Sequence, residues 1–144
     1  MKRLSGFERL RPRAPGVTLI ELIVVVTIVG ILTAIAVPSY MSYTTRTHRS
    51  AAKSCLSDFA QVMERYYTTN LTYVGATATL ACQSDSGMGD WYTFAATNLA
   101  QQTYTVTATP IGAQAIRDAK CGSLSVDQAG LRTVSGSGGT SYCW

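Results

Sequence analysis

Residues 17–37 read VTLIELIVVVTIVGILTAIAV, and Glu21 is the only charged residue among them. At about 1.5 Å per residue, a helix of this length reaches about 31 Å, which is the thickness of the hydrocarbon core of a bilayer. The stretch therefore predicts a membrane-spanning helix. An ordinary secretory signal is the alternative, because residues 34–36, Ala-Ile-Ala, fit a cleavage site. The apolar run is, however, longer than the core of such a signal and carries a carboxylate.

Basic residues are concentrated before the apolar stretch. Residues 1–16 contain five Lys or Arg and one acidic residue, whereas residues 17–144 contain seven of each sign. By the positive-inside rule, the N-terminus stays in the cytoplasm and the residues after the span lie outside. The formal charge of +4 is therefore an orientation signal, and the remainder of the chain is neutral.

The composition excludes a disordered chain and gives no sign of an enzyme. The 144 residues are 47% hydrophobic and 14% charged, which suits one domain with a packed core. His48 is the single histidine, no glycine-rich phosphate loop follows a strand, and no carboxylates are paired. We therefore expect no catalytic site, no cofactor and no metal site.

Residues 38–67 predict an amphipathic helix, because apolar side chains recur at spacings of three and four. We expect this stripe to pack on a sheet and the charged residues to lie largely off it. His48 is expected to be solvated or to face another subunit. The apolar stripe consists of Ala52, Cys55, Leu56, Phe59, Met63 and Tyr66. The basic residues expected on a solvated or subunit-facing surface are Arg46, His48, Arg49 and Lys53.

The remaining residues, 68–144, predict a small antiparallel sheet. Aromatic and β-branched residues alternate in four segments, and a sheet of this size needs the amphipathic helix to cover one face. The sequence therefore predicts an α+β fold in which one long helix precedes an antiparallel meander. The expected strands are 91–94, 103–109, 122–127 and 131–134, with loops at 70–90 and 111–120.

Residues 16–21, GVTLIE, follow a short basic leader and precede an unbroken apolar helix and Pro38. This pattern resembles the class III signal of type IV pilins and pseudopilins. The resemblance implies that a prepilin peptidase removes residues 1–16 by cutting between Gly16 and Val17, and that it methylates the new amine of Val17. Residues 17–37 would then stay attached as a membrane and filament-core helix. The family usually has phenylalanine where this chain has Val17.

Glu21 needs a partner once it lies in an apolar environment. In a stack of subunits, its carboxylate can meet the Val17 amine of a neighbouring chain and set the register of assembly. The alternative is a tolerated polar side chain that extends toward the cytoplasmic interface. Gly30 and Pro38 are candidate points of helix flexibility, since both weaken a helix, although Gly30 can instead permit close helix packing.

The four cysteines all follow the predicted span, on the side where disulfides form. Three pairings are possible. We prefer Cys55–Cys82, which ties the helix to the connecting loop, together with Cys121–Cys143, which ties the last loop to the sheet. The second bond would close the element called the D-region in pilins, within which residues 135–140, SGSGGT, are expected to form a flexible tip. Trp144 is expected either to pack on the sheet or to face another subunit.

The C-terminal third resembles the PilE-like minor pilins of Gram-negative bacteria, on the segments YTVTATP at 104–110, CGSLSVDQAG at 121–130 and the final Cys-Trp. The resemblance implies a structural subunit that acts in pilus assembly, adhesion and twitching motility. It would enter the inner membrane as a single-pass prepilin and then join an extracellular pilus. The implied partners are other pilin subunits, the prepilin peptidase and the assembly machinery of the inner membrane.

Three alternative functions stay open at this stage. A pseudopilin of type II secretion shares the signal, although no acidic cluster for calcium is visible near the C-terminus. A major pilin differs mainly in abundance. A DNA-uptake pilin needs an exposed basic patch, and the C-terminal region offers only Arg117, Lys120 and Arg132. We therefore expect weak DNA binding at most.

Overall fold

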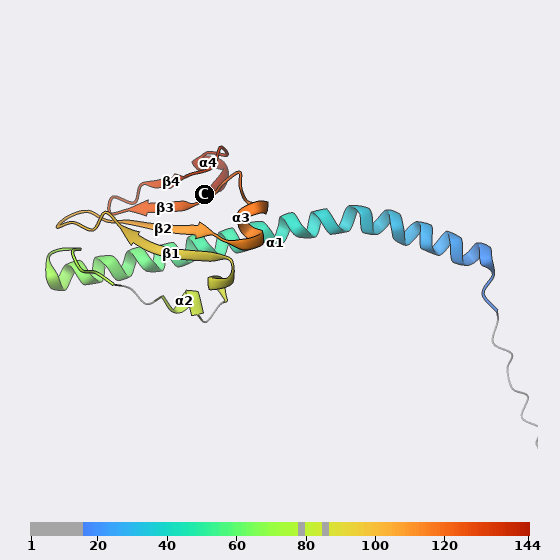
Figure 1. Ribbon diagram of the computed structural model, residues 1–144, viewed down its shortest axis with the longest axis horizontal. Coiled ribbons are helices and arrows are strands. Elements are labelled where there is room, and N and C mark those ends of the chain that lie inside the picture. Colours follow the sequence, from blue (N-terminus) through green and yellow to red (C-terminus); the bar gives the residue numbers. More distant parts are fainter. Residues whose placement is uncertain (1–15, 78–79, 85–86) are drawn as a thin grey trace, which may run out of the picture. The chain divides into compact units, whose positions relative to one another are not determined.

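The structure is a computed structural model that describes residues 16–77, 80–84 and 87–144. Residues 1–15 of the predicted leader lie outside the described residues. The chain divides into two compact units, Met1–Pro38 and Ser39–Trp144. Helix α1 (Leu19–Asn70), labelled in Figure 1, contributes residues to both units and contains Pro38.

The first unit contains the apolar part of α1. The hydroxyl of Thr18 accepts a hydrogen bond from the backbone N–H of Glu21 and so caps the helix. Within the helix, the hydroxyls of Thr27 and Thr33 donate to the carbonyls of Ile23 and Val29, respectively, at 2.7 Å. These hydroxyls are satisfied inside the helix, as an apolar environment requires. Among the described residues, α1 is the one helix long and apolar enough to cross a membrane.

The second unit contains a four-stranded antiparallel sheet in the order β1-β2-β3-β4. The predicted meander is therefore confirmed. In the register, Phe94 of β1 lies opposite Ala108 of β2, and Ala108 also lies opposite Leu124 of β3. The strands are β1 (Tyr92–Thr97), β2 (Thr105–Pro110), β3 (Leu124–Asp127) and β4 (Arg132–Val134).

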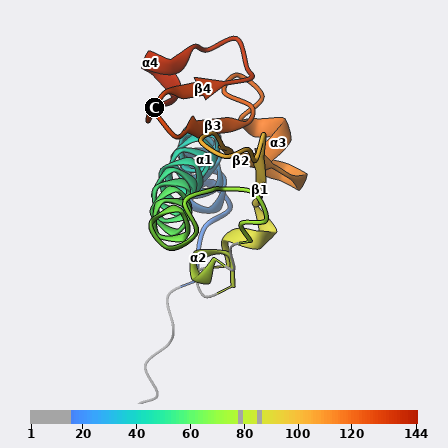
Figure 2. The same ribbon diagram turned by 90° about the vertical axis from the view of Figure 1, so that its left-hand side faces the viewer.

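The core of this unit lies between α1 and one face of the sheet (Figure 2). The sheet contributes Tyr92, Val106, Ala108 and Leu124, all of which are fully buried. The helix contributes the predicted stripe, of which Ala52, Cys55, Leu56, Phe59 and Met63 are buried and Tyr66 is half-buried. The expectation that the amphipathic segment covers the sheet is confirmed.

Short helices occupy segments that were expected to be loops. In the segment 70–90 the structure contains α2 (Ala81–Ser84) and the 3₁₀ helix η1 (Met88–Asp90). Between β2 and β3 lies α3 (Gly112–Arg117), and the chain closes with α4 (Thr140–Cys143). Each of these helices is six residues or shorter, so none is long enough to display an apolar period in the sequence.

Two disulfides connect two of these short helices, α2 and α4, to the rest of the unit. Cys55 of α1 is bonded to Cys82 of α2, with 5.8 Å between the Cα atoms. Cys121, just before β3, is bonded to Cys143 of α4, with 5.6 Å between the Cα atoms. These are the two pairs preferred from the sequence.

Candidate functional site

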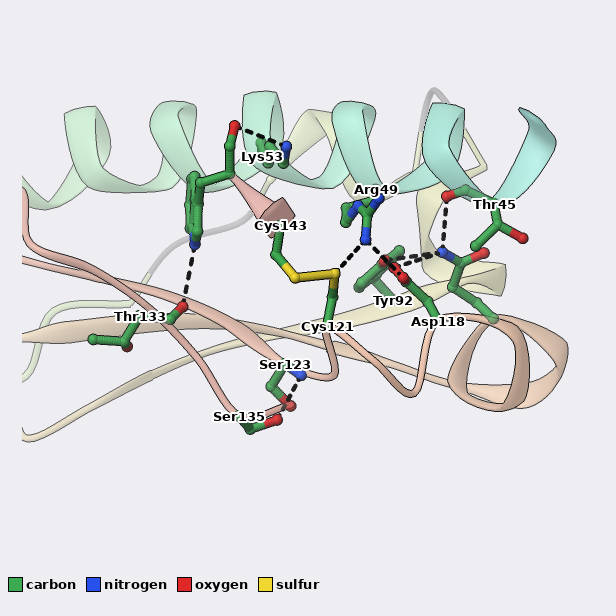
Figure 3. Close-up of a disulfide and its surroundings, with 12 residues drawn as sticks. Thr45, Arg49, Lys53, Tyr92, Asp118, Cys121, Ser123, Thr133, Ser135 and Cys143 are labelled. Carbon is green, nitrogen blue, oxygen red and sulfur yellow. Dashed lines mark hydrogen bonds and ion pairs between the residues drawn. A yellow bond between two sulfur atoms is a disulfide. The ribbon is translucent and has the colours of Figure 1, made fainter. Parts of the chain in front are cut away.

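A buried ion pair joins α1 to the segment after α3. Arg49 Nη1 lies 2.8 Å from Asp118 Oδ1, and both side chains are less than one-tenth exposed. The same nitrogen donates a hydrogen bond to the sulfur of Cys121 (Figure 3). The prediction that Arg49 lies on a solvated face is therefore wrong. It is buried because it follows Thr45 and precedes Ala52 at helical spacing, which places it on the stripe that faces the sheet.

Polar side chains complete the surroundings of Asp118. Its Oδ2 accepts hydrogen bonds from the hydroxyl of Tyr92 at 3.2 Å and from the amide of Gln114 at 3.3 Å. Gln114 also donates to the carbonyl of Thr45 at 3.1 Å. Burial raises the pKa of Asp118 above its ordinary value, and the charge of Arg49 opposes that rise. These bonds fix α1, β1 and α3 against one another. They are made by the side chains of Arg49, Tyr92, Gln114 and Asp118 and by the carbonyl of Thr45.

His48, the neighbour of Arg49, also differs from its expectation. Its ring stacks on Trp91 with 4.1 Å between the ring centroids, and its side chain is half-buried. The expectation was a histidine that is solvated or faces another subunit. The ring instead packs within its own chain, so it is not fully solvated, and the second alternative stays a prediction. The imidazole packs on the chain just before β1 because the apolar rim of the sheet extends to Trp91.

The glycine-rich segment after β4 is held closely against the chain before β3. The N–H groups of Gly136 and Gly138 donate to the carbonyls of Cys121 and Lys120, at 2.9 and 2.7 Å. The hydroxyl of Ser135 accepts from the N–H of Ser123 at 2.8 Å (Figure 3). The segment expected to be a flexible tip is thus fastened by its backbone, and it leads directly into α4.

Cations and aromatic rings gather on α4 and its neighbours. We call Lys53, Lys120, Arg132, Tyr142 and Trp144 the cationic–aromatic face. Lys120 Nζ lies 4.5 Å from the centroid of the Tyr142 ring, and the guanidinium carbon of Arg132 lies 5.1 Å from that of Trp144. Lys120, Arg132 and Tyr142 are exposed, and Lys53 and Trp144 are half-buried. Cation–π contacts of this length hold the charges at defined positions.

Trp144 is anchored through both its side chain and its backbone. The indole N–H donates to the carbonyl of Thr133 on β4 at 3.2 Å, and Lys53 Nζ donates to the carbonyl of Trp144 at 3.0 Å (Figure 3). The expectation that Trp144 packs on the sheet is confirmed. Burial, together with the positive charges of Arg49 and Arg132, lowers the pKa of Lys53, and the charge of Asp118 opposes that change.

A second polar cluster lies elsewhere in the unit, near the end of α1. The carboxylate of Glu64 accepts hydrogen bonds from the hydroxyls of Tyr73 and Tyr104, each at 3.0 Å. Tyr73 stacks on Tyr67 and meets Tyr104 edge to face, with 4.7 Å between the ring centroids in both pairs. This cluster ties α1 to the loop that follows it and to the start of β2. Its described members, Glu64, Tyr67, Tyr73 and Tyr104, include no Lys or Arg.

The residues singled out in the sequence fall into two groups. Gly16, Val17 and Glu21 lie at or near the start of α1 in the first unit, and Gly30 and Pro38 lie within the helix. Arg117, at the end of α3, is exposed. Lys53, Tyr142 and Trp144, which lie beside Lys120 and Arg132, were not predicted as part of a basic patch. Among the described residues, no three His, Cys, Asp or Glu side chains come together as metal ligands.

Two family models match the chain. Residues 38–125 match the family described as type IV minor pilin ComP, DNA uptake sequence receptor. Residues 11–37 match the prokaryotic N-terminal methylation motif. The first match covers more than half of the chain and includes Lys53 and Lys120, while Arg132, Tyr142 and Trp144 follow its last residue.

A solved structure with the same fold is the crystal structure of the non-core minor pilin PilV of Neisseria meningitidis. The TM-score is 0.51 and the sequence identity is 20%, over 66% of this chain and 90% of that chain. At this identity the likeness establishes the α+β fold of a long helix and an antiparallel sheet. None of the curated proteins compared matches the chain.

Proposed function

Because the chain belongs to the family of the type IV minor pilin ComP, we propose that it is a pilus subunit that binds DNA through its cationic–aromatic face. The chain is a type IV minor pilin, as the sequence predicted. The family model describes ComP as a DNA uptake sequence receptor. The expectation of weak DNA binding at most rested on the C-terminal region's having only Arg117, Lys120 and Arg132 as basic residues. The proposal replaces it with binding at a local site.

The arrangement of charges carries the proposal. Phosphate groups are bound by local clusters of Lys and Arg, and the net charge of the remaining chain matters little at physiological ionic strength, because charges more than about 8 Å apart are largely screened. Lys120 and Arg132 are exposed and lie over rings of neighbouring aromatic residues. Of the described carboxylates near them, Asp118 is buried and paired with Arg49. Asp127, in the turn before Arg132, accepts the N–H groups of Ala129 and Leu131. Neither Lys120 nor Arg132 forms an ion pair among the described residues, so both can meet a phosphate backbone.

The rings give the cations a defined geometry. Lys and Arg side chains on a surface normally sample many rotamers, and ordering them on binding costs free energy. A ring under each charge restricts that sampling before DNA arrives. The exposed side chain of Tyr142 also offers its hydroxyl for sugar or base contacts.

The experiment measures DNA affinity at several salt concentrations. The full chain is purified in a nonionic detergent and titrated into a labelled DNA duplex, and fluorescence anisotropy reports binding. We expect the logarithm of the association constant to fall linearly with the logarithm of salt concentration. The double variant Lys120→Ala, Arg132→Ala should bind about tenfold more weakly, and its slope should be smaller by about 2.

The matched control is Arg65→Ala. Arg65 is also an exposed cation on this unit, but it lies twelve residues beyond Lys53, which is about 18 Å along α1. Its removal lowers the net charge by one and should leave the affinity and the slope nearly unchanged. Binding that is insensitive to salt, or that falls equally in the control, contradicts the proposal and leaves a structural minor pilin without a DNA site.

Processing and location form a second part of the proposal. We propose that the prepilin peptidase cuts between Gly16 and Val17 and methylates Val17, and the methylation-motif match over residues 11–37 supports this. The helix after the cut would hold the subunit in the inner membrane, N-terminus inside, before it enters the pilus with other pilins. There Glu21 would pair with the Val17 amine of a neighbouring subunit, and Gly30 and Pro38 would let the helix bend. Adhesion and twitching motility remain predictions from the resemblance.

A further inference from the structure

We infer that the Arg49–Asp118 ion pair is a positioning device for the cationic–aromatic face: it holds Lys120 and Tyr142 in their DNA-binding arrangement without contacting DNA. The inference rests on the proposed function, because it concerns the same face. It assigns a role to two residues that the DNA contact itself does not use. Both lie beneath the surface that Lys120 and Tyr142 form.

Arg49 reaches two segments that are far from it in the sequence, residues 118–121 and α4. Its Nη1 is bonded to Asp118 after α3 and donates to the sulfur of Cys121 before β3. Its guanidinium carbon lies 5.5 Å from the centroid of the Tyr142 ring on α4. One side chain of α1 thus touches both the disulfide that holds α4 and the aromatic ring that α4 presents.

Asp118 fixes the backbone that carries Lys120. Its carbonyl oxygen accepts the N–H groups of Cys121 and Gly122, both at 2.9 Å, while its carboxylate is held by Arg49. The carbonyl of Lys120 in turn accepts the N–H of Gly138, one residue before the N-cap of α4. The path from the ion pair to the face is therefore a continuous chain of short hydrogen bonds.

Exposure separates the positioning residues from the binding residues. Arg49 is 7% exposed and Asp118 is 4% exposed, whereas Tyr142 is 51% exposed. A guanidinium that is buried and already paired is not available to phosphate. The ring of Tyr142 has Lys120 Nζ at 4.5 Å and Arg49 at 5.5 Å, so it lies in contact with one exposed and one buried cation.

The variant Asp118→Asn separates positioning from simple electrostatics. Loss of a carboxylate near a phosphate-binding face would tighten DNA binding if charge alone mattered. If the ion pair positions the face, DNA binding should instead weaken by about tenfold, with the salt slope unchanged, because no phosphate contact is lost. Glu64→Gln is the control, since it makes a similar acid-to-amide change in the cluster of Tyr73 and Tyr104.

A second variant covers the case in which Asp118→Asn does not fold, since a lone buried charge is strongly destabilising. The double variant Arg49→Met, Asp118→Leu removes both charges together, keeps the net charge and fills the space with apolar atoms, a replacement that is often neutral for stability. It should bind the duplex about tenfold more weakly than the unaltered chain, again with the slope unchanged. Affinity equal to that of the unaltered chain in this variant would overturn the inference.

Hydrogen exchange provides a readout that needs no DNA. In either variant, the amides of residues 140–144 should exchange about tenfold faster, whereas those of α1 around Leu56 should not change. If the unaltered chain binds no DNA, the proposed function fails, and exchange still decides whether the ion pair positions α4. Unchanged exchange at 140–144 contradicts the inference whatever the DNA result.

Discussion

Gly136 lies against the carbonyl group of Lys120 so closely that a Cβ atom at position 136 would overlap it. The contact explains why the segment 135–140 is rich in glycine. Its backbone must approach residues 120 and 121 to form the hydrogen bonds that lead into α4. Small residues here serve close packing between two backbones.

The substitution Gly136→Ala should therefore destabilise the fold. Because the added methyl group meets backbone atoms, which cannot rotate away, we expect a loss of about 1–3 kcal/mol in the free energy of unfolding. Denaturant titration followed by circular dichroism measures it. Ser137→Ala, at the exposed neighbouring position, should change the stability by less than about 0.5 kcal/mol. Equal stability of both variants would show that the backbone can shift to admit the methyl group.

Loss of either disulfide should lower stability, but the two losses should differ in their effect on DNA. The sequence separations are 27 and 22 residues, so loop-closure entropy predicts a similar cost of about 3.5 kcal/mol for each bond. The pair Cys121→Ala, Cys143→Ala releases α4 and should also weaken DNA binding. The pair Cys55→Ala, Cys82→Ala should keep the affinity at temperatures where the protein remains folded. Equal loss of affinity in both would argue against a separate role for α4.

Stability should fall in alkaline solution because of the tyrosine cluster at Glu64. Burial and the hydrogen bond to Glu64 raise the pKa of Tyr73 from 10.0 to about 12. Between pH 10 and about pH 12, the hydroxyl of Tyr73 therefore stays protonated in the folded chain and loses its proton in the unfolded chain. The stabilisation is fully present below pH 10 and is lost as the pH rises toward 12. Unfolding midpoints across this range, together with tyrosinate absorbance, measure the effect.

The variant Tyr73→Phe tests that assignment. Phenylalanine keeps the ring stack on Tyr67 but cannot ionise, so the fall in stability should be less steep. Tyr104 continues to contribute, because burial and Glu64 also raise its pKa. An identical alkaline profile in the variant and the unaltered chain would exclude Tyr73 as a source of the pH dependence.

Mass spectrometry of the mature N-terminus checks the processing proposal. A chain that begins at a methylated Val17 is the expected result. The variant Gly16→Ala should block the cut and leave the leader attached, whereas Thr18→Ser should be processed normally. A mature chain that begins at Val37 would identify an ordinary secretory signal and contradict the pilin-type cleavage site.

The main elements of the fold could be predicted because they repeat a simple period. The buried stripe of α1 follows a helical spacing, and the four strands show alternating or β-branched sequence. The same reasoning missed α3, whose six residues are held by the buried amide of Gln114 and its contact with Thr45. Such a contact joins residues 69 positions apart and leaves no local pattern.

The candidate site was the least predictable part for the same reason. Arg49 continues the spacing of Thr45, Ala52 and Leu56, and this spacing was the available sign that it is buried. Its partner Asp118 lies 69 residues away and could not be chosen from the sequence. The rings of Tyr142 and Trp144 lie beside the cations because of long-range contacts. Residues 135–138 pack against 120–123, Cys143 is bonded to Cys121, and Trp144 is bonded to Thr133 and Lys53.

The contact between Arg132 and Trp144 gives the protein a built-in optical reporter. A guanidinium 5.1 Å from the centroid of the indole ring influences its emission, so a ligand that draws Arg132 away should shift the fluorescence. The sequence contains one other tryptophan, Trp91, which stacks on His48. In a Trp91→Phe background, the remaining indole would follow occupancy of the face in real time without an attached dye.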